Sequence, residues 1–324
     1  MLNVRDLTIT FPSNAGPLAA VEGLSFTIER NETFAIIGES GSGKSLTAMS
    51  VVGLTPPGAQ VTGEITLNGD PLSGLSDRAL ARVRGRRIGI VYQDPISALN
   101  PVHRIGDQIA EGLIVHGLAR RSEAARQAVS LLDKMRIPDP GRVALAYPHQ
   151  ISGGMRQRAV FAMALACGPD LLIADEPTTA LDVTIKAQVL DLLRTLRSEM
   201  DLTTLLITHD MGVVAEAADR ILVMYAGQIA ELGPAEAILS APSHPYSQAL
   251  LQSALIGEAA PQTILPAVAG APPGLTEVVT GCRFNPRCPF ATDLCRKEVP
   301  APRSVGPVTV ACHHPITHKA EAAT

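Results

Sequence analysis

The segment "GESGSGKS", residues 38–45, has the residue types and spacing of a phosphate-binding loop. Its pattern is G-x-x-x-x-G-K-S, and the apolar run "TFAII" stands directly before it. In this pattern glycines allow backbone N–H groups to close around phosphate oxygens, Lys44 reaches the β- and γ-phosphates, and the Ser45 hydroxyl can bind Mg²⁺. Because a strand-like run precedes the loop and a helix-compatible run follows it, the segment predicts a nucleotide site rather than a chance glycine turn.

Two carboxylates, Asp175 and Glu176, follow the apolar run "LLIA". Adjacent acids after a strand are often a helix cap or a solvated pair. In a chain with a phosphate loop, however, a strand end is where an acid that organises a metal belongs. The combination favours a catalytic interpretation, in which Asp175 holds the shell of Mg²⁺ and Glu176 polarises the attacking water.

Three more polar residues lie beside apolar runs: Gln93 in "IGIVYQDP", Asp182 in "TTALD" and His209 in "LLITHD". Each of them alone fits a capped strand end or a turn. A second glycine-rich segment, "HQISGGMRQR" (residues 149–158), begins a run of helix-forming residues. Its free N–H groups and helix dipole would suit phosphate oxygens, so the chain carries two segments with this property.

The elements that must position these residues follow from the hydrophobic pattern. "LNVRDLTITF" and "GEITLNGDPL" indicate strands of a small antiparallel layer. "TFAIIG", "DLLIAD" and "TTLLIT" are short apolar runs separated by helical stretches, which predicts a parallel sheet with crossover helices. From about residue 96 to 165 the spacing is helical, and beyond residue 233 Pro, Ala and Gly predict a loop-rich extension.

Composition narrows the class of protein. The chain has 324 residues and a net charge of -4, so nucleic acid is not the leading partner. The longest mainly apolar run, "AVFAMALACG", is far shorter than the roughly 18–20 residues that cross a bilayer, and the first residues lack the pattern of a signal peptide. We therefore expect a cytoplasmic protein, which could still dock onto a membrane protein.

Taken in order, the motifs make the chain resemble the ATP-binding cassette (ABC) ATPases of membrane transporters, over about residues 2–233. The family order of phosphate loop, Gln loop, Ser-Gly-Gly signature, acidic strand, D-loop and switch histidine is matched by "GESGSGKS", "VYQDP", "ISGGMRQ", "LLIADEP", "ALD" and "ITHD". The resemblance implies an α/β P-loop NTPase fold with a RecA-like core, an antiparallel β subdomain and an inserted helical subdomain at about 96–165. Residues 1–233 would form the ATPase domain and 234–324 a small cysteine-containing extension.

Further segments suggest to which branch of the ABC ATPases the chain is similar. The signature has Ile151 and Met155 where the common form reads "LSGGQ", so a polar contact of the general pattern can be missing. "SGGMRQR", "QDPISALNP", "HPYSQALL" and "GCRFNPRCPFATDLC" look like the oligopeptide and dipeptide permease branch.

The resemblance also implies a role for each site residue, with ATP and Mg²⁺ as cofactors. Glu176, His209, Lys44 and Gln93 would be catalytic, and Ser45, Gln93 and Asp175 would hold Mg²⁺. The signature would cap the γ-phosphate of ATP held by the opposite subunit of a head-to-tail dimer, and Asp182 would bridge the two halves. Phe11 would stack on adenine, although a core position fits it equally well. The nucleotide-binding set is Phe11, Gly38, Glu39, Ser40, Gly41, Ser42, Gly43, Lys44, Ser45, Leu46, Gln93, Ser152, Gly153, Gly154, Asp175 and Asp182.

The function implied is an importer energy subunit at the cytoplasmic face of the membrane, closing as a dimer on two ATPs. Its partners would be a second ABC ATPase, expected to be a distinct paralogue, two transmembrane permease subunits and an extracytoplasmic solute-binding protein, with no nucleic acid. The solute would be a di- or oligopeptide; nickel, an opine or a glutathione-like peptide are alternatives. A soluble ABC ATPase of DNA repair or translation is a further alternative, but the chain has no second cassette, coiled-coil insertion or basic surplus.

The cysteines need their own explanation. Cys282, Cys288, Cys295 and Cys312 fall in the extension, whereas Cys167 stands in an apolar run and is expected in the core. Their spacing lacks the paired C-x-x-C of common zinc knuckles, and four thiolates suit either an iron-sulfur cluster or zinc. In the resembling permease ATPases a similar extension holds a [4Fe-4S] cluster, which is the favoured expectation here, with zinc or free thiols as alternatives.

Overall fold

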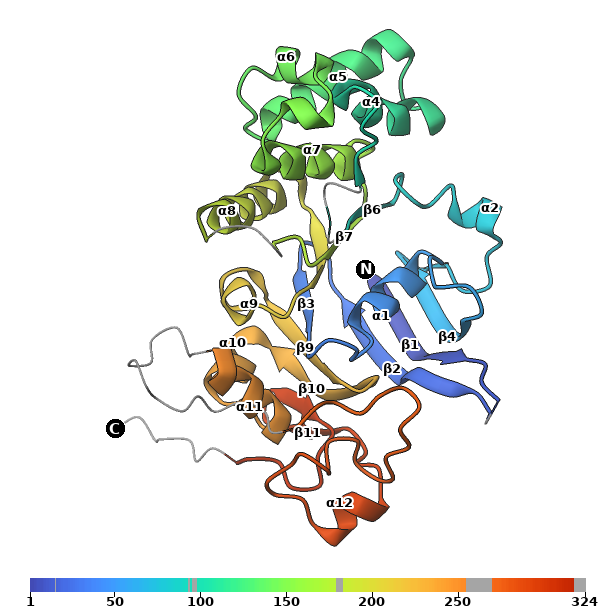
Figure 1. Cartoon of the computed structure of the whole chain (residues 1–324), viewed down its shortest axis with the longest axis vertical. Helices are drawn as coiled ribbons and strands as arrows, with labels where there is room; N and C mark the ends of the chain where they lie inside the picture. The colour runs from blue at the N-terminus through green and yellow to red at the C-terminus, as the bar shows by residue number, and fades with distance from the viewer. Residues whose placement is uncertain (15, 93, 95–97, 179–182, 255–269, 318–324) are drawn as a thin grey trace. The chain divides into compact units, whose positions relative to one another are not determined.

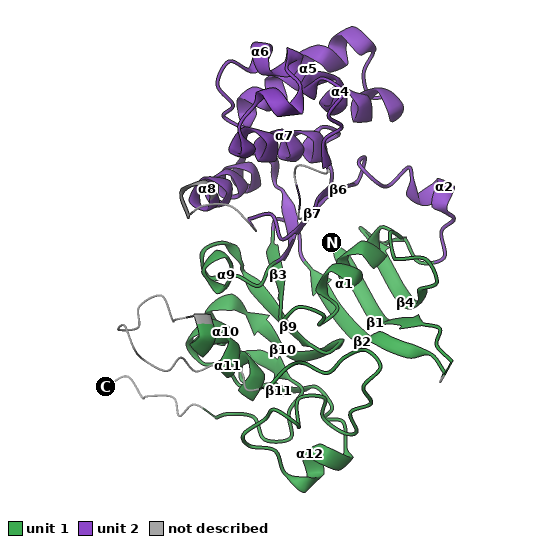
Figure 2. Ribbon diagram, viewed as in Figure 1, with its two compact units in different colours: residues 1–28, 32–73, 208–324 green, residues 29–31, 74–207 purple. Residues whose placement is uncertain are grey.

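The computed structural model describes residues 1–14, 16–92, 94, 98–178, 183–254 and 270–317, drawn in colour in Figure 1. They form two compact units (Figure 2). Unit 1 contains residues 1–28, 32–73 and 208–324, and unit 2 contains residues 29–31 and 74–207. Within the described residues, no helix combines the length and the apolar character needed to cross a membrane.

Unit 1 contains an antiparallel sheet in the order β2-β1-β4-β5. Its strands are β1 (Leu2–Phe11), β2 (Leu18–Ile28), β4 (Gln60–Leu67) and β5 (Asp70–Pro71). Strand β1 buries Leu2, Val4, Leu7 and Ile9 completely or almost so. The apolar positions of β1 are thus the ones on its buried face, which explains the alternation in the sequence. The predicted antiparallel layer is confirmed.

The second set of strands in unit 1 runs in the order β11-β12-β10-β9-β3. The strands are β3 (Thr33–Ile37), β9 (Arg220–Tyr225), β10 (Gln228–Pro234), β11 (Arg303–Val305) and β12 (Val308–Val310). Only β3 and β9 pair in parallel, and the other pairs are antiparallel. The two short strands of the C-terminal extension therefore lie at one edge of the sheet, where β12 pairs with β10.

The helices of unit 1 are α1 (Lys44–Val51), α9 (Met211–Ala217), α10 (Ala235–Ser240), α11 (Pro245–Ala254) and α12 (Asp293–Lys297). Side chains from β3 and β9 share one core with α10, α11 and Phe284, which belong to residues 234–324. Within unit 1, the extension is thus joined to the preceding residues through a common apolar core as well as through strand pairing.

Unit 2 contains three parallel strands in the order β6-β7-β8: β6 (Ile88–Val91), β7 (Leu171–Asp175) and β8 (Thr203–Ile207). Every residue of β7 and β8 is buried, as continuous apolar runs require. The strands β3, β7 and β8 lie within the three predicted apolar runs, and the prediction of parallel pairing is confirmed for β7 with β8.

The helices of unit 2 are α2 (Asp77–Leu80), α4 (Ile105–Val115), α5 (Arg121–Lys134), α6 (Pro140–Leu145), α7 (Gly153–Leu165) and α8 (Val183–Met200), with a 3-10 turn at Pro148–Gln150. Helix α6 starts where Asp139 accepts a hydrogen bond from Arg142 N and Pro140 occupies the first turn. Helices α4 to α7 pack around one core, to which Cys167 contributes as expected.

Candidate functional site

The phosphate loop joins β3 to α1 in unit 1. Gly38, Gly41 and Gly43 all have positive φ, of 150°, 80° and 97°. A Cβ atom on Gly38 would lie 2.2 Å from the carbonyl oxygen of Met224 on β9, so only glycine allows this close approach. The sequence pattern is therefore explained by backbone conformation and by contact with the neighbouring strand.

Lys44 is buried inside this loop, with 6% of its surface exposed. Its ammonium donates hydrogen bonds to the carbonyl oxygens of Gly38 at 2.8 Å and Glu39 at 2.9 Å. A lysine is seldom buried unless its charge is compensated. Two carbonyl oxygens hold the ammonium at the loop, where it can meet the negative charge of nucleotide phosphates.

His209 follows β8 and belongs to unit 1, where it is exposed. The preceding residue, Thr208, donates its backbone N–H to the carbonyl oxygen of Ile36 on β3 at 3.3 Å. The next residue, Asp210, accepts hydrogen bonds from the N–H groups of Gly212 and Val213 and begins α9. His209 thus lies between Thr208, which is hydrogen-bonded to Ile36, and Asp210, which caps α9. Ile36 is two residues before the start of the phosphate loop.

Asp175 and Glu176 lie at the end of β7 in unit 2. Asp175 is 9% exposed, and Glu176 has a left-handed backbone with φ 48°. The Glu176 N–H donates to the carbonyl oxygen of Ile207 at 2.8 Å, which holds this uncommon conformation in place. Strained backbone of this kind is often found at functional sites, where it aims a side chain.

The signature segment lies at the start of α7. Ser152 is the N-cap, and its hydroxyl accepts a hydrogen bond from Met155 N at 3.3 Å. Gly153 and Gly154 form the first turn, and a Cβ atom on Gly153 would meet no heavy atom within 4 Å. An open helix start with a polar cap can accept an anion, as the sequence predicts.

Helix α7 is also joined to the segment after the two carboxylates. Gln157 donates from Nε2 to the carbonyl oxygen of Pro177 at 2.8 Å, and both groups are buried. A groove of about 410 Å³ opens beside the start of the helix, lined by Arg142, Val143, Leu145, Ala146, Gln150, Ile151, Ser152 and Met155. Within unit 2, the signature helix and the carboxylate loop therefore form one connected structure.

Two predicted site residues, Gln93 and Asp182, lie outside the residues that the structure describes. Phe11 is the last residue of β1, half-buried and paired with Leu18. Its predicted contact with adenine stays a prediction.

The four cysteines of the extension line one small pocket together with His244, Phe284 and Phe290. All four are free, and the N–H of Cys282 donates to the carbonyl oxygen of Cys295 at 2.8 Å. Burial, and then the charge of the other thiolates, raises the pKa of Cys312 to about 11. Among the described residues, no group of three or more His, Cys, Asp or Glu side chains is arranged to hold a metal ion. The thiols converge, but the structure gives no support for a bound iron-sulfur cluster.

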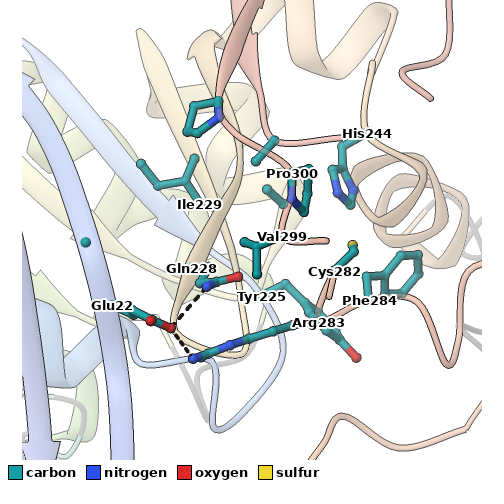
Figure 3. Close-up of a pocket in the computed structure, with 14 residues that line it drawn as sticks. Glu22, Tyr225, Gln228, Ile229, His244, Cys282, Arg283, Phe284, Val299 and Pro300 are labelled. Carbon is teal, nitrogen blue, oxygen red and sulfur yellow. Dashed lines mark hydrogen bonds and ion pairs between the residues drawn. The ribbon is translucent and has the colours of Figure 1, made fainter. Parts of the chain in front are cut away.

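Beside these cysteines lies a pocket of about 140 Å³, shown in Figure 3. Glu22 of β2 accepts hydrogen bonds there from Gln228 at 3.1 Å and from Arg283 (Figure 3). Burial lowers the pKa of His244 in its wall to about 4, so this imidazole is neutral near pH 7. The Glu22–Arg283 ion pair and the hydrogen bond from the His244 N–H to the Glu231 carboxylate attach the extension to β2 and β10.

Sequence reasoning missed a contact between the extension and the phosphate loop. Arg287 forms an ion pair with Glu39, and Tyr246 accepts a hydrogen bond from the backbone N–H of Glu39. The only signal for Arg287 in the sequence is its place next to Cys288 in "NPRCP", which indicates no partner.

Comparison with known proteins adds family evidence. A family model described as ABC transporter matches residues 21–179, and one described as oligopeptide/dipeptide transporter, C-terminal region, matches residues 230–295. The chain is 44% identical to the dipeptide transport ATP-binding protein DppD of Escherichia coli, over 98% of this chain and 97% of that protein. It is 50% identical to the oligopeptide transport ATP-binding protein OppD of Mycobacterium tuberculosis, over 93% of this chain but only about half (49%) of that protein.

Solved structures agree with this result. The dimeric post-hydrolysis structure of the ATP-binding cassette MJ0796, bound to ADP and Pi, has a TM-score of 0.64 and 28% identity, covering 72% of this chain and 99% of that one. CbiO1 of Clostridium perfringens, part of the ABC transporter complex CbiONQ, has a TM-score of 0.63 and 26% identity, covering 74% of this chain and 90% of that one. The fold of an ABC ATPase, with its antiparallel β subdomain, is confirmed.

Proposed function

Since the chain belongs to the ABC transporter ATP-binding proteins, in the branch for oligopeptide and dipeptide transport, we propose that it hydrolyses ATP to power import of di- or oligopeptides through a membrane permease. The observation that carries this proposal is the similarity to DppD along almost the whole length of both proteins. The phosphate loop with its buried Lys44 supplies the nucleotide site that such an activity needs.

In the proposed mechanism, Lys44 and the loop N–H groups bind the ATP phosphates. The Ser45 hydroxyl and the Asp175 carboxylate offer the oxygen ligands that Mg²⁺ prefers, with Gln93 as a third. Glu176 orients and polarises the attacking water, and His209 contacts the γ-phosphate. Little covalent chemistry is required of the protein, because positioning and charge stabilisation supply most of the rate.

The proposed assembly is a head-to-tail dimer, in which Ser152, Gly153 and Gly154 cap the ATP of the opposite subunit and Asp182 bridges the halves. The open helix start at Gly153 supports this role for the signature. The dimer that MJ0796 forms with ADP and Pi is consistent with it. The second ATPase is proposed to be a distinct paralogue, joined by two permease subunits and a solute-binding protein, with the chain peripheral on the cytoplasmic face of the membrane.

Peptide import can be tested with the variant Lys44→Met, which keeps the apolar stem of the side chain and removes its charge. We expect it to abolish uptake of labelled di- and oligopeptides by cells, because phosphate binding loses its main cation. Lys134→Met, at an exposed lysine ending α5, should leave uptake unchanged. If peptide uptake persists although the Lys44→Met variant is assembled in the membrane, this chain does not power peptide import. Uptake of nickel, opines and glutathione-like peptides would then be assayed.

We also propose that Cys282, Cys288, Cys295 and Cys312 bind one metal centre, a [4Fe-4S] cluster with zinc as the alternative. The proposal rests on the chemistry of this donor set, since four thiolates suit either centre and all four cysteines line one pocket. Such a centre would stabilise a segment that has few apolar residues of its own, and we assign it no redox role. We expect protein purified without oxygen to contain iron and sulfide, and Cys288→Ser to lose both. Zinc in the purified wild type would show that the centre is zinc and not an iron-sulfur cluster. A folded wild type without any metal would refute the proposal.

A further inference from the structure

Glu39, the second residue of the phosphate loop, is held by the extension. The Arg287 guanidinium donates two parallel hydrogen bonds to its carboxylate, from Nη1 to Oε2 at 2.6 Å and from Nη2 to Oε1 at 2.9 Å. The Arg287 side chain is 5% exposed and that of Glu39 is 25% exposed. A bidentate pair with a buried arginine is fixed in geometry and is screened less by solvent than a fully exposed ion pair.

The same residue also contacts the lysine of the loop. The carbonyl oxygen of Glu39 accepts one of the hydrogen bonds of Lys44, and its N–H donates to the Tyr246 hydroxyl at 2.8 Å. Side chain, carbonyl and N–H of Glu39 are thus all occupied. Any displacement of Glu39 would move the backbone on which Lys44 rests.

Arg287 is itself positioned by the folded extension. It donates to the Tyr225 hydroxyl at 3.2 Å and to the carbonyl oxygen of Gly270 at 3.1 Å, and its guanidinium lies 5.7 Å from the centre of the Tyr225 ring. Tyr225, Tyr246 and Phe284 form a cluster of aromatic rings beneath it. Hydrogen bonding to Glu39 raises the pKa of Arg287 above its usual value, so its charge is permanent.

The charges give this contact a consequence for nucleotide binding. Glu39 places a carboxylate in a loop that must accept phosphate groups of the same sign. Arg287 neutralises that carboxylate and holds it in a fixed pair. Without Arg287, the carboxylate would be uncompensated beside the phosphates and free to repel them.

We propose that Arg287 is a positioning residue for ATP binding, which fixes and neutralises Glu39 and thereby makes the ATP affinity depend on the folded cysteine-bearing extension. The inference rests on the proposed nucleotide site at Lys44. Arg287 acts through Glu39 and touches no reacting atom. Its loss should therefore raise KM for ATP and leave kcat nearly unchanged.

The test measures equilibrium binding of Mg·ATP to the full chain and steady-state ATP hydrolysis. Arg287→Met should weaken ATP binding roughly tenfold or more, as expected for loss of a charge-assisted contact. In the double variant Arg287→Met/Glu39→Gln the repelling charge is gone, so ATP should bind several-fold more tightly than it binds to Arg287→Met. Arg296→Met is the matched control: this exposed arginine on α12 pairs with Asp293 of its own helix, and affinity should not change.

The outcomes separate the inference from the proposed function. If the wild type binds ATP and Lys44→Met does not, the proposed nucleotide site is supported. The other variants then test the role of Arg287. Wild-type affinity in folded Arg287→Met would overturn the inference, as would a double variant no better than Arg287→Met, since that result would indicate a purely structural role. Should Arg287→Met fail to fold, Arg287→Lys decides, because it keeps the charge but loses the paired geometry; a KM raised about threefold at unchanged kcat is expected, and wild-type KM would overturn the inference.

Discussion

Glu176→Gln is expected to lower the rate of ATP hydrolysis by about 10²–10⁴-fold and to leave ATP affinity within about threefold of wild type. The amide has almost the same shape as the carboxylate but cannot accept a proton or polarise water as strongly. The carboxylate stands at the end of a fully buried strand, on a backbone with φ 48° that the hydrogen bond to Ile207 holds. Glutamine can occupy the same backbone, so the change is confined to the chemistry.

The measurement is single-turnover hydrolysis together with equilibrium ATP binding. Glu199→Gln, an exposed carboxylate on α8 in the same unit, is the control and should hydrolyse ATP at the wild-type rate. An unchanged rate in Glu176→Gln would mean that another group activates the water. A loss of ATP binding would instead place Glu176 among the binding residues.

Gly89→Ala is expected to lower the free energy of unfolding of unit 2 by about 2–3 kcal/mol. Gly89 lies on β6, and a Cβ atom there would be 2.3 Å from the carbonyl oxygen of Ala164 on α7 and 3.2 Å from the Pro169 side chain. The nearest atom belongs to helix backbone, so a side-chain rotation cannot relieve the overlap. The signature helix would have to move away from the strand and give up close packing.

Thermal unfolding checks this prediction, and for a unit of this size the melting temperature should fall by about 4–12 °C. Gly141→Ala is the matched control, because that glycine lies within α6 with no heavy atom within 4 Å of the added Cβ. It should be neutral or should raise stability by up to about 1 kcal/mol through helix propensity. Equal stability of Gly89→Ala and wild type would contradict the close approach of β6 and α7.

Local pattern was sufficient for the elements and for the motifs. The apolar runs at residues 33–38, 170–175 and 203–208 match β3, β7 and β8 to within one residue at each end. A strand buried on both faces must be continuously apolar, so the ends of the strand can be predicted from where the apolar run stops in the sequence. The same holds for Lys44, whose ammonium is held by the carbonyl oxygens of Gly38 and Glu39 a few residues away.

Contacts between distant residues could not be predicted in this way. The convergence of Cys282, Cys288, Cys295 and Cys312 depends on how several loops fold back on each other, and their spacing left zinc, iron-sulfur and free thiols open. The need for glycine at position 89 is likewise invisible in "RIGIVY", because the carbonyl oxygen that excludes a side chain lies on another element.

By itself, the sequence determined that this chain is an α/β protein with a phosphate loop and the ordered motifs of an ABC ATPase, because those features depend on hydrophobic period and on residues within one turn of each other. Only the tertiary structure decided that Arg287 meets Glu39 across 248 positions of chain. Neither residue has a local feature that selects the other. Their pairing results from a shared aromatic core and from strand pairing, which bring the extension to the phosphate loop once the chain has folded.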